Sequence, residues 1–179
     1  MLWFYGVAIV VAAIAAWIDF RTGNIPNELT YAAIAVGPVA HLFFTIVKTH
    51  SRGDAARDVG FAFLGAVLCG ILPIGLFRVS ALGGGDVKLF LALGSLLLPL
   101  AGLEAELWSF CAAAFLAPIR LAWEGKLFQT VTNAAYIIAN PVLPKARRRE
   151  LDPETVSWFR MGPAILAGTI VTAYLHLHD

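Results

Sequence analysis

Residues 2–18 read LWFYGVAIVVAAIAAWI, an unbroken apolar stretch without a single charged side chain. A helix needs about 20 apolar residues to cross the roughly 30 Å hydrocarbon core of a bilayer, and about 17 is near the lower limit. Five further apolar runs follow at 29–47, 59–77, 87–103, 107–123 and 161–175. Because alternating apolar and polar patterns are absent, we predict an all-α polytopic membrane protein with six transmembrane helices.

The composition supports a membrane protein and excludes several other classes. Of the 179 residues, 59% are hydrophobic and only 14% are charged, whereas soluble domains contain about 45–50% apolar residues even with glycine included. The net charge of +1 provides no basic surface for nucleic acid, so no nucleic-acid partner is expected. The two cysteines, Cys69 and Cys111, lie far apart and form no CxxC motif. We expect one domain over residues 1–179.

The distribution of basic residues predicts the orientation of the chain in the membrane. With the N-terminus outside, the inner loops at 19–28, 78–88 and about 120–160 contain ten of the 13 Lys and Arg residues. The outer loop at 48–58 contains the other three, and the turn at 103–106 holds only Glu104 and Glu106. Since cytoplasmic loops are enriched in basic residues, we predict that both termini lie outside.

The longest inner loop, residues 126–160, has a pattern of its own. Apolar residues recur at helical spacing between 127 and 138, which predicts an amphipathic helix lying in the membrane interface. A basic cluster at 145–149 would then contact anionic lipid. The alternative is that this loop docks a protein substrate.

Two aspartates differ from the other acids because each adjoins an apolar run. Asp19 directly follows the first run, and Asp86 ends Gly83-Gly84-Gly85-Asp86 and opens the fourth. They lie 67 residues apart in sequence, yet the predicted topology places both at the cytoplasmic mouth of the bundle. The alternative is a flexible turn in which Asp86 only caps a helix.

A pair of carboxylates at such a position has specific chemistry. Two carboxylates about 3 Å apart cannot both ionise easily, so they share one proton and titrate as a unit. The ionised member can take a proton from a water molecule between them, and the protonated member can donate one to a peptide carbonyl oxygen. This chemistry hydrolyses a peptide bond without a metal or a cofactor, and we expect neither.

The residues around the two aspartates are candidates for shaping the site. Gly83, Gly84 and Gly85 lack Cβ atoms, which lets the backbone adopt positive φ angles and lets another strand approach closely, so a substrate segment could lie along them with its scissile carbonyl near Asp86. We expect Lys88 to extend to the membrane interface.

Between the first two runs, Pro26 and Asn27 belong to a turn that would fix how two helices cross. Arg21 either marks the inner side of the membrane or orients a carboxylate.

These motifs resemble those of one protein family. Residues 19–27, DFRTGNIPN, resemble the D-x-R-x-x-x-I-P-N segment of the prepilin peptidases, the type IV leader peptidase family. Residues 81–89, ALGGGDVKL, resemble the family's G-x-G-D-V-K motif, whose GxGD core is shared with other intramembrane aspartyl proteases. Residues 161–165, MGPAI, resemble the glycine–proline stretch that opens the family's last helix.

The resemblance implies an aspartic endopeptidase of the bacterial inner membrane. Such enzymes remove the leader peptide from pilin-like precursor proteins at the cytoplasmic face, and Asp19 and Asp86 match their two catalytic aspartates. Larger members carry an additional segment with paired CxxC motifs that is linked to N-methylation. This sequence has no such motif, so it resembles the short, peptidase-only type of tight-adherence (Flp) pilus systems.

Two other functions compete with the peptidase. A small transporter or proton-relay subunit could use the same aspartates, although a relay needs polar groups across the whole membrane depth. A non-catalytic assembly factor of a pilus or secretion machine is the third possibility. The sequence does not define the oligomeric state.

Overall fold

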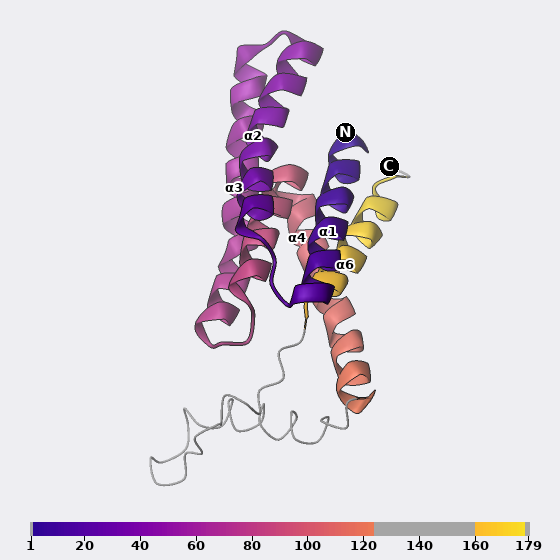
Figure 1. Ribbon diagram of the computed structural model, residues 1–179. Coiled ribbons are helices and arrows are strands. Elements are labelled where there is room, and N and C mark those ends of the chain that lie inside the picture. Colours follow the sequence, from indigo (N-terminus) through magenta and orange to yellow (C-terminus); the bar gives the residue numbers. More distant parts are fainter. Residues whose placement is uncertain (1, 124–159, 178–179) are drawn as a thin grey trace. The chain divides into compact units, whose positions relative to one another are not determined.

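The computed structural model describes residues 2–123 and 160–177, and every regular element within those ranges is an α-helix. The helices are α1 (Leu2–Thr22), α2 (Asn27–Thr49), α3 (Arg52–Arg78), α4 (Gly84–Trp123) and α6 (Gly162–Leu175) (Figure 1). The chain divides into two compact units, one formed by Met1–Ala113 with Arg160–Asp179 and the other by Ala114–Phe159. Both Asp19 and Asp86 belong to the first unit.

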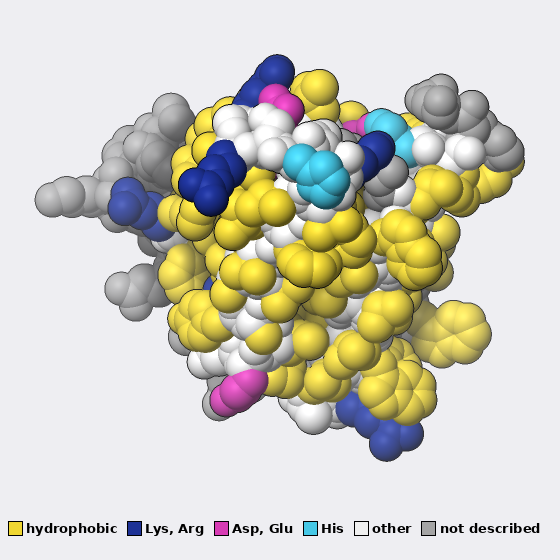
Figure 2. All heavy atoms as spheres, turned by 90° about the horizontal axis from the view of Figure 1, so that it is seen from above, with side chains coloured by type: hydrophobic (Ala, Val, Ile, Leu, Met, Phe, Trp, Pro, Cys, Tyr) yellow, Lys and Arg dark blue, Asp and Glu magenta, His cyan; other side chains and the backbone are white. Residues whose placement is uncertain are grey.

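The chain is an all-α membrane protein, as the sequence predicts. Helices α1 to α4 are long and apolar enough to cross a membrane, and α6 is apolar but shorter. Large apolar side chains such as Trp3, Phe43 and Leu100 are exposed, at 78%, 65% and 85%. Viewed from above, apolar side chains cover most of the visible face, and charged ones are few (Figure 2). Lipid is the solvent that such a surface requires.

Helix α4 consists of two helical arms that are joined at Leu98. This residue has φ 66° and ψ 172°, which is not a helical conformation. A Cβ on Gly102 would lie 2.9 Å from the Cα of Gly94, whereas eight residues of straight helix span about 12 Å. Phe90 on the first arm also stacks on Phe110 of the second, with ring centroids 5.5 Å apart. The chain therefore turns back sharply at Leu98.

The predicted turn at 103–106 is wrong, because the reversal occurs at Leu98 instead. The apolar pattern placed the turn after residue 103, because residues 87–103 are apolar on both sides of the actual bend. Glu104 and Glu106 consequently lie inside the second arm. Glu104 pairs with His176 of α6 at 3.6 Å, whereas Glu106 is only 3% exposed. The count of six spans stays a prediction.

The predicted outer loop at 48–58 is also much shorter than expected. Helix α2 continues to Thr49 and α3 begins at Arg52. Ser51 caps α3 by accepting a hydrogen bond from the backbone N–H of Asp54 at 3.3 Å. A capping serine favours a helix start even where charged residues follow, which is why the helix extends beyond its apolar run.

The helices pack through small residues and a few buried hydrogen bonds. Helix α1 lies along α6, and α2 lies along α3 (Figure 1). Gly65 of α3 meets Gly94 of α4 backbone to backbone, so a Cβ on either would collide with the other's carbonyl oxygen. Small residues allow such close crossings in membrane proteins.

Two further contacts attach the arms of α4 to other helices. The first arm meets α2 where Leu96 O lies 3.0 Å from Nε2 of the buried His41. The second arm meets α6, because a Cβ on Gly168 would collide with Ser109. The amphipathic helix predicted between 127 and 138 and the basic cluster at 145–149 lie outside the described residues.

Candidate active site

Asp19 lies in the last turn of α1 and is 5% exposed. Its Oδ2 accepts a hydrogen bond of 2.9 Å from the backbone N–H of Gly162, the first residue of α6. The first N–H groups of a helix have no partner within the helix, and they carry the positive end of its dipole. The beginning of α6 therefore provides a ready donor for the Asp19 carboxylate.

Gly162 can reach Asp19 only because it lacks a side chain. A Cβ at this position would lie 2.9 Å from both Asp19 Oδ2 and the Cα of Ala16. Real Cβ atoms do not approach other atoms so closely, so α6 and α1 would have to separate. Pro163 follows in the first turn of α6, where its missing N–H costs nothing because that group would lack a helical partner.

Asp86 lies in the first turn of α4 and is half-buried. Its Oδ2 lies beside Gly83, 2.9 Å from the position that a Cβ would take. Its Oδ1 is buried, and no donor in residues 2–123 or 160–177 reaches it. One oxygen of Asp86 thus lies against Gly83, and the other is buried without a donor in those residues.

The structure brings Asp19 and Asp86 close enough for their carboxylates to interact electrostatically. They come from the end of α1 and the beginning of α4, so the two helices contribute one acid each. Two acids brought together from different helices are the residue types that general acid–base catalysis with a carboxylate pair uses.

The glycines before Asp86 act differently from the sequence-based expectation. Among the described glycines, only Gly23 has a positive φ, so Gly83, Gly84 and Gly85 do not use that conformational freedom. A Cβ on Gly85 would lie 3.0 Å from the Cβ of Ile25. The close approach therefore comes from this chain's own α1–α2 connection.

The same connection is bound to α4 by a hydrogen bond. Pro26 has extended geometry (φ −62°, ψ 137°) and immediately precedes α2. Lys88 Nζ donates to Asn27 Oδ1 at 2.6 Å, and the ammonium also lies over the Tyr31 ring, 5.1 Å from its centroid. Lys88 thus joins the start of α2 to the start of α4, one helical turn or less from Asp86.

The aspartate motifs lie within a region that matches a known family. The family model described as the type IV leader peptidase family matches residues 6–118, which include Asp19, Asp86 and Lys88. The chain belongs to the type IV leader peptidase family. It is also similar to prepilin peptidase EppA of Methanothermobacter thermautotrophicus, at 33% identity over 94 residues. That match covers 51% of this chain and 22% of the relative's length. No solved structure matches the chain significantly.

This family member contains two site residues that the sequence motifs did not identify. Gly162 supplies the donor to Asp19, and it lies beyond the matched region. Arg160 Nη1 donates to the carbonyl of Phe20, which follows Asp19. The glycine–proline stretch at 161–165 is the sequence signal for Gly162. Arg160 stands out in the sequence only as one of the basic residues of the predicted inner loop.

Arg21 points along its own helix in this family member. Its guanidinium lies over the Trp17 ring, 4.5 Å from the centroid. This contact agrees with an exposed basic residue at the membrane boundary, where tryptophan is also enriched. Across residues 2–123 and 160–177, no group of three His, Cys, Asp or Glu side chains could hold a metal ion.

Proposed function

We propose that this chain is an aspartic endopeptidase that removes the leader peptide from type IV pilin-like precursors. The observation that carries this proposal is that Asp19 and Asp86, from the ends of two different helices, lie close enough to interact electrostatically. Membership of the type IV leader peptidase family supports it. The absence of a CxxC motif favours the short, peptidase-only type of tight-adherence pilus systems, with a pilin-like precursor protein as substrate and lipid as its surroundings.

The geometry suggests a different role for each aspartate. Asp19 accepts a backbone N–H from the beginning of α6, an environment suited to a carboxylate. It would take a proton from the attacking water molecule. Asp86 has one buried oxygen that receives no hydrogen bond from residues 2–123 or 160–177, and we propose that this acid gives its proton to the oxygen of the scissile carbonyl.

In this proposal, hydrolysis of the peptide bond takes place in two steps. Water oxygen bonds to the carbonyl carbon and forms a tetrahedral diol, with its proton on Asp19 and the Asp86 proton on the former carbonyl oxygen. Collapse of this intermediate breaks the C–N bond, and the proton on Asp19 passes to the leaving amine. Asp86 recovers a proton from the diol, so the pair returns to its starting state with one shared proton.

The test is processing of a pilin-like precursor that is co-expressed in membranes. Asp19→Asn and Asp86→Asn should each abolish cleavage while the protein accumulates normally. Asp54→Asn is the matched control, because this acid lies in the first turn of α3, far along the chain from either motif. Full processing by either site variant would disprove the dyad. Ion or solute flux in proteoliposomes without proteolysis would favour the proton-relay alternative.

We also propose that cleavage occurs at the cytoplasmic face of the inner membrane, with both termini outside. In a background without Cys69 and Cys111, Arg21→Cys should react with an impermeant thiol reagent only from the cytoplasmic side. His50→Cys, in the α2–α3 turn, should react only from the other side. The reverse pattern would overturn the orientation that the basic residues predict.

A further inference from the structure

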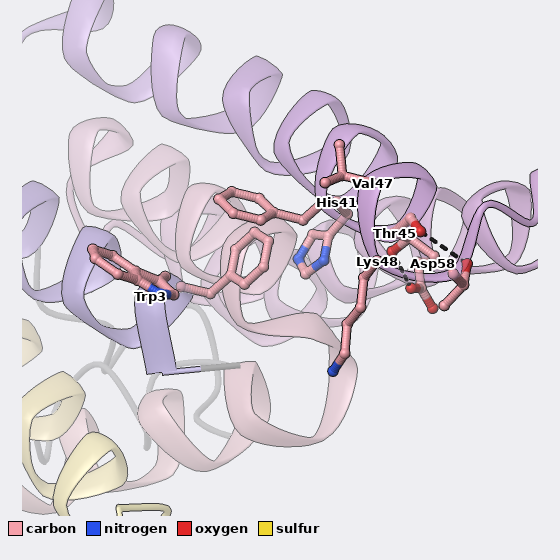
Figure 3. A pocket seen from close by; sticks show the side chains of 9 residues that line it. Trp3, His41, Thr45, Val47, Lys48 and Asp58 are labelled. Atoms are coloured by element: carbon pink, nitrogen blue, oxygen red, sulfur yellow. Dashed lines mark hydrogen bonds between the residues drawn. The ribbon is translucent and has the colours of Figure 1, made fainter.

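A second hollow lies at the opposite end of α1 from Asp19. Trp3 and Phe4 of α1 line it, and 15 residues of helix separate Phe4 from Asp19, about 23 Å along the axis. The hollow has a volume of about 400 Å³ and is otherwise lined by residues of α2 and α3 (Figure 3). It therefore faces the membrane boundary remote from the two aspartates.

The inner wall of this hollow is formed largely by aromatic rings. Phe4 stacks on the ring of His41, with centroids 3.9 Å apart and planes inclined by 3°. His41 Nε2 is already engaged by Leu96 O at 3.0 Å, and Phe44 meets Phe4 edge to face. A ligand that binds here must have an apolar part that packs against this wall.

The rim of the hollow presents one cation and one anion that are not paired with each other. Thr45 Oγ1 donates to Asp58 Oδ2 at 2.6 Å, which fixes the carboxylate of α3 against α2. Lys48 is exposed, and its side chain extends away from the Thr45–Asp58 pair (Figure 3). No acid within the described part of the chain forms an ion pair with Lys48. A ligand that carries both charges can engage both groups at once.

We propose that this hollow binds a phospholipid with an ethanolamine headgroup. Its phosphate would meet the Lys48 ammonium, its primary ammonium would donate to the Asp58 carboxylate, and its glycerol and upper acyl chain would lie against Trp3 and Phe44. An anionic headgroup without an amine would face Asp58 with like charge. A choline headgroup has the correct charges but no N–H to donate, so charged hydrogen bonding would be lost.

The test uses the full-length protein in detergent, stripped of lipid and exposed to equal amounts of three lipids. These are the ethanolamine, choline and glycerol phospholipids with identical acyl chains. Native mass spectrometry then measures how much of each lipid is present in the complex of one protein with one lipid. We expect the ethanolamine lipid to predominate by about tenfold, since a charged hydrogen bond is at stake. Free phosphoethanolamine in excess should not displace it, because it cannot occupy the apolar wall.

Two variants and two matched controls decide the outcome. Asp58→Asn should remove the preference, because the carboxylate that meets the amine is lost, and the amide oxygen that it introduces can still accept from Thr45, so the fold is preserved. Lys48→Met should lower the retention of all three lipids alike, because each of them carries the phosphate that Lys48 meets. Arg52→Met and Asp54→Asn change the same kinds of charge outside the hollow and should keep the preference. Equal retention of the choline lipid, displacement by free phosphoethanolamine, a preference that survives in Asp58→Asn, or unchanged lipid retention in Lys48→Met would each overturn the proposal.

Discussion

Asp19 and Glu106 are both acids buried within the helix bundle, at 5% and 3% exposed, but their surroundings differ. Asp19 accepts a backbone N–H from the beginning of α6 and interacts with a second acid. Neither oxygen of Glu106 has a hydrogen-bond partner among residues 2–123 and 160–177. Burial alone therefore does not distinguish these two acids, and what separates them is the backbone donor and the neighbouring acid that Asp19 has.

The largest expected effect tests whether Asp19 and Asp86 act as one unit. Each single change to Asn should lower the rate of precursor cleavage by about 10²–10⁴-fold or more, because one proton transfer is lost. The double variant should be no slower than the slower single variant, since groups that act together are not additive. The measurement is the initial cleavage rate with purified protein in lipid. Single effects that multiply in the double variant would show independent roles instead.

A smaller loss is expected when the donor to Asp19 is displaced. Gly162→Ala adds a Cβ 2.9 Å from Asp19 Oδ2, so α6 must move and the acid with it. A displacement of about 1 Å costs on the order of 100-fold in rate. Gly6→Ala on α1 is the control, because nothing lies within 4 Å of the added atom. Equal cleavage by both variants would show that the N–H of Gly162 is dispensable.

The aspartate motifs could be predicted from sequence because each is a short local pattern at the end of an apolar run. The helices also follow from apolar length, since lipid requires internal hydrogen bonding of the backbone. Predicting that Asp19 and Asp86 form a pair required only the inference that both lie at one membrane depth. The electrostatic contact between them agrees with that inference.

The reversal at Leu98 could not be predicted in the same way. Leu98 is flanked by Leu97 and Pro99 within a continuous apolar run, and hydropathy does not respond to backbone direction. Pro99 is the local signal, because the residue before a proline is disfavoured in the α conformation, and the close approach of Gly94 and Gly102 accompanies the bend. The donor from Gly162 was missed for a similar reason, because it is a backbone group 143 residues away in sequence.

The hydrogen bond between Lys88 and Asn27 should have a moderate effect. Lys88→Met removes a 2.6 Å contact that joins α2 to α4 next to Asp86. We expect about a fivefold loss of cleavage rate, since a partly exposed hydrogen bond contributes about 1 kcal/mol. Asn27→Ala should cause a similar loss, and the double variant should add little to either.

Arg52→Met, at the beginning of α3, serves as the basic control, and it should leave the rate unchanged. Strictly multiplicative losses for Lys88→Met and Asn27→Ala would show that the two side chains act separately. In that case the link between α2 and α4 would have no part in holding Asp86.

The smallest effect is expected at Glu106, and it is a gain in stability. Both oxygens of this side chain are buried without partners in the part of the chain that the structure describes, and leaving such a group unsatisfied costs about 1–3 kcal/mol. Glu106→Met keeps the volume, so it should raise the free energy of unfolding and leave the cleavage rate unchanged. Glu104→Met is the matched control on the same helix, because Glu104 pairs with His176 at 3.6 Å and should give no gain. Thermal unfolding in detergent measures both variants. A loss of cleavage in Glu106→Met would place this acid in the chemistry, and the contrast with Asp19 would then fail.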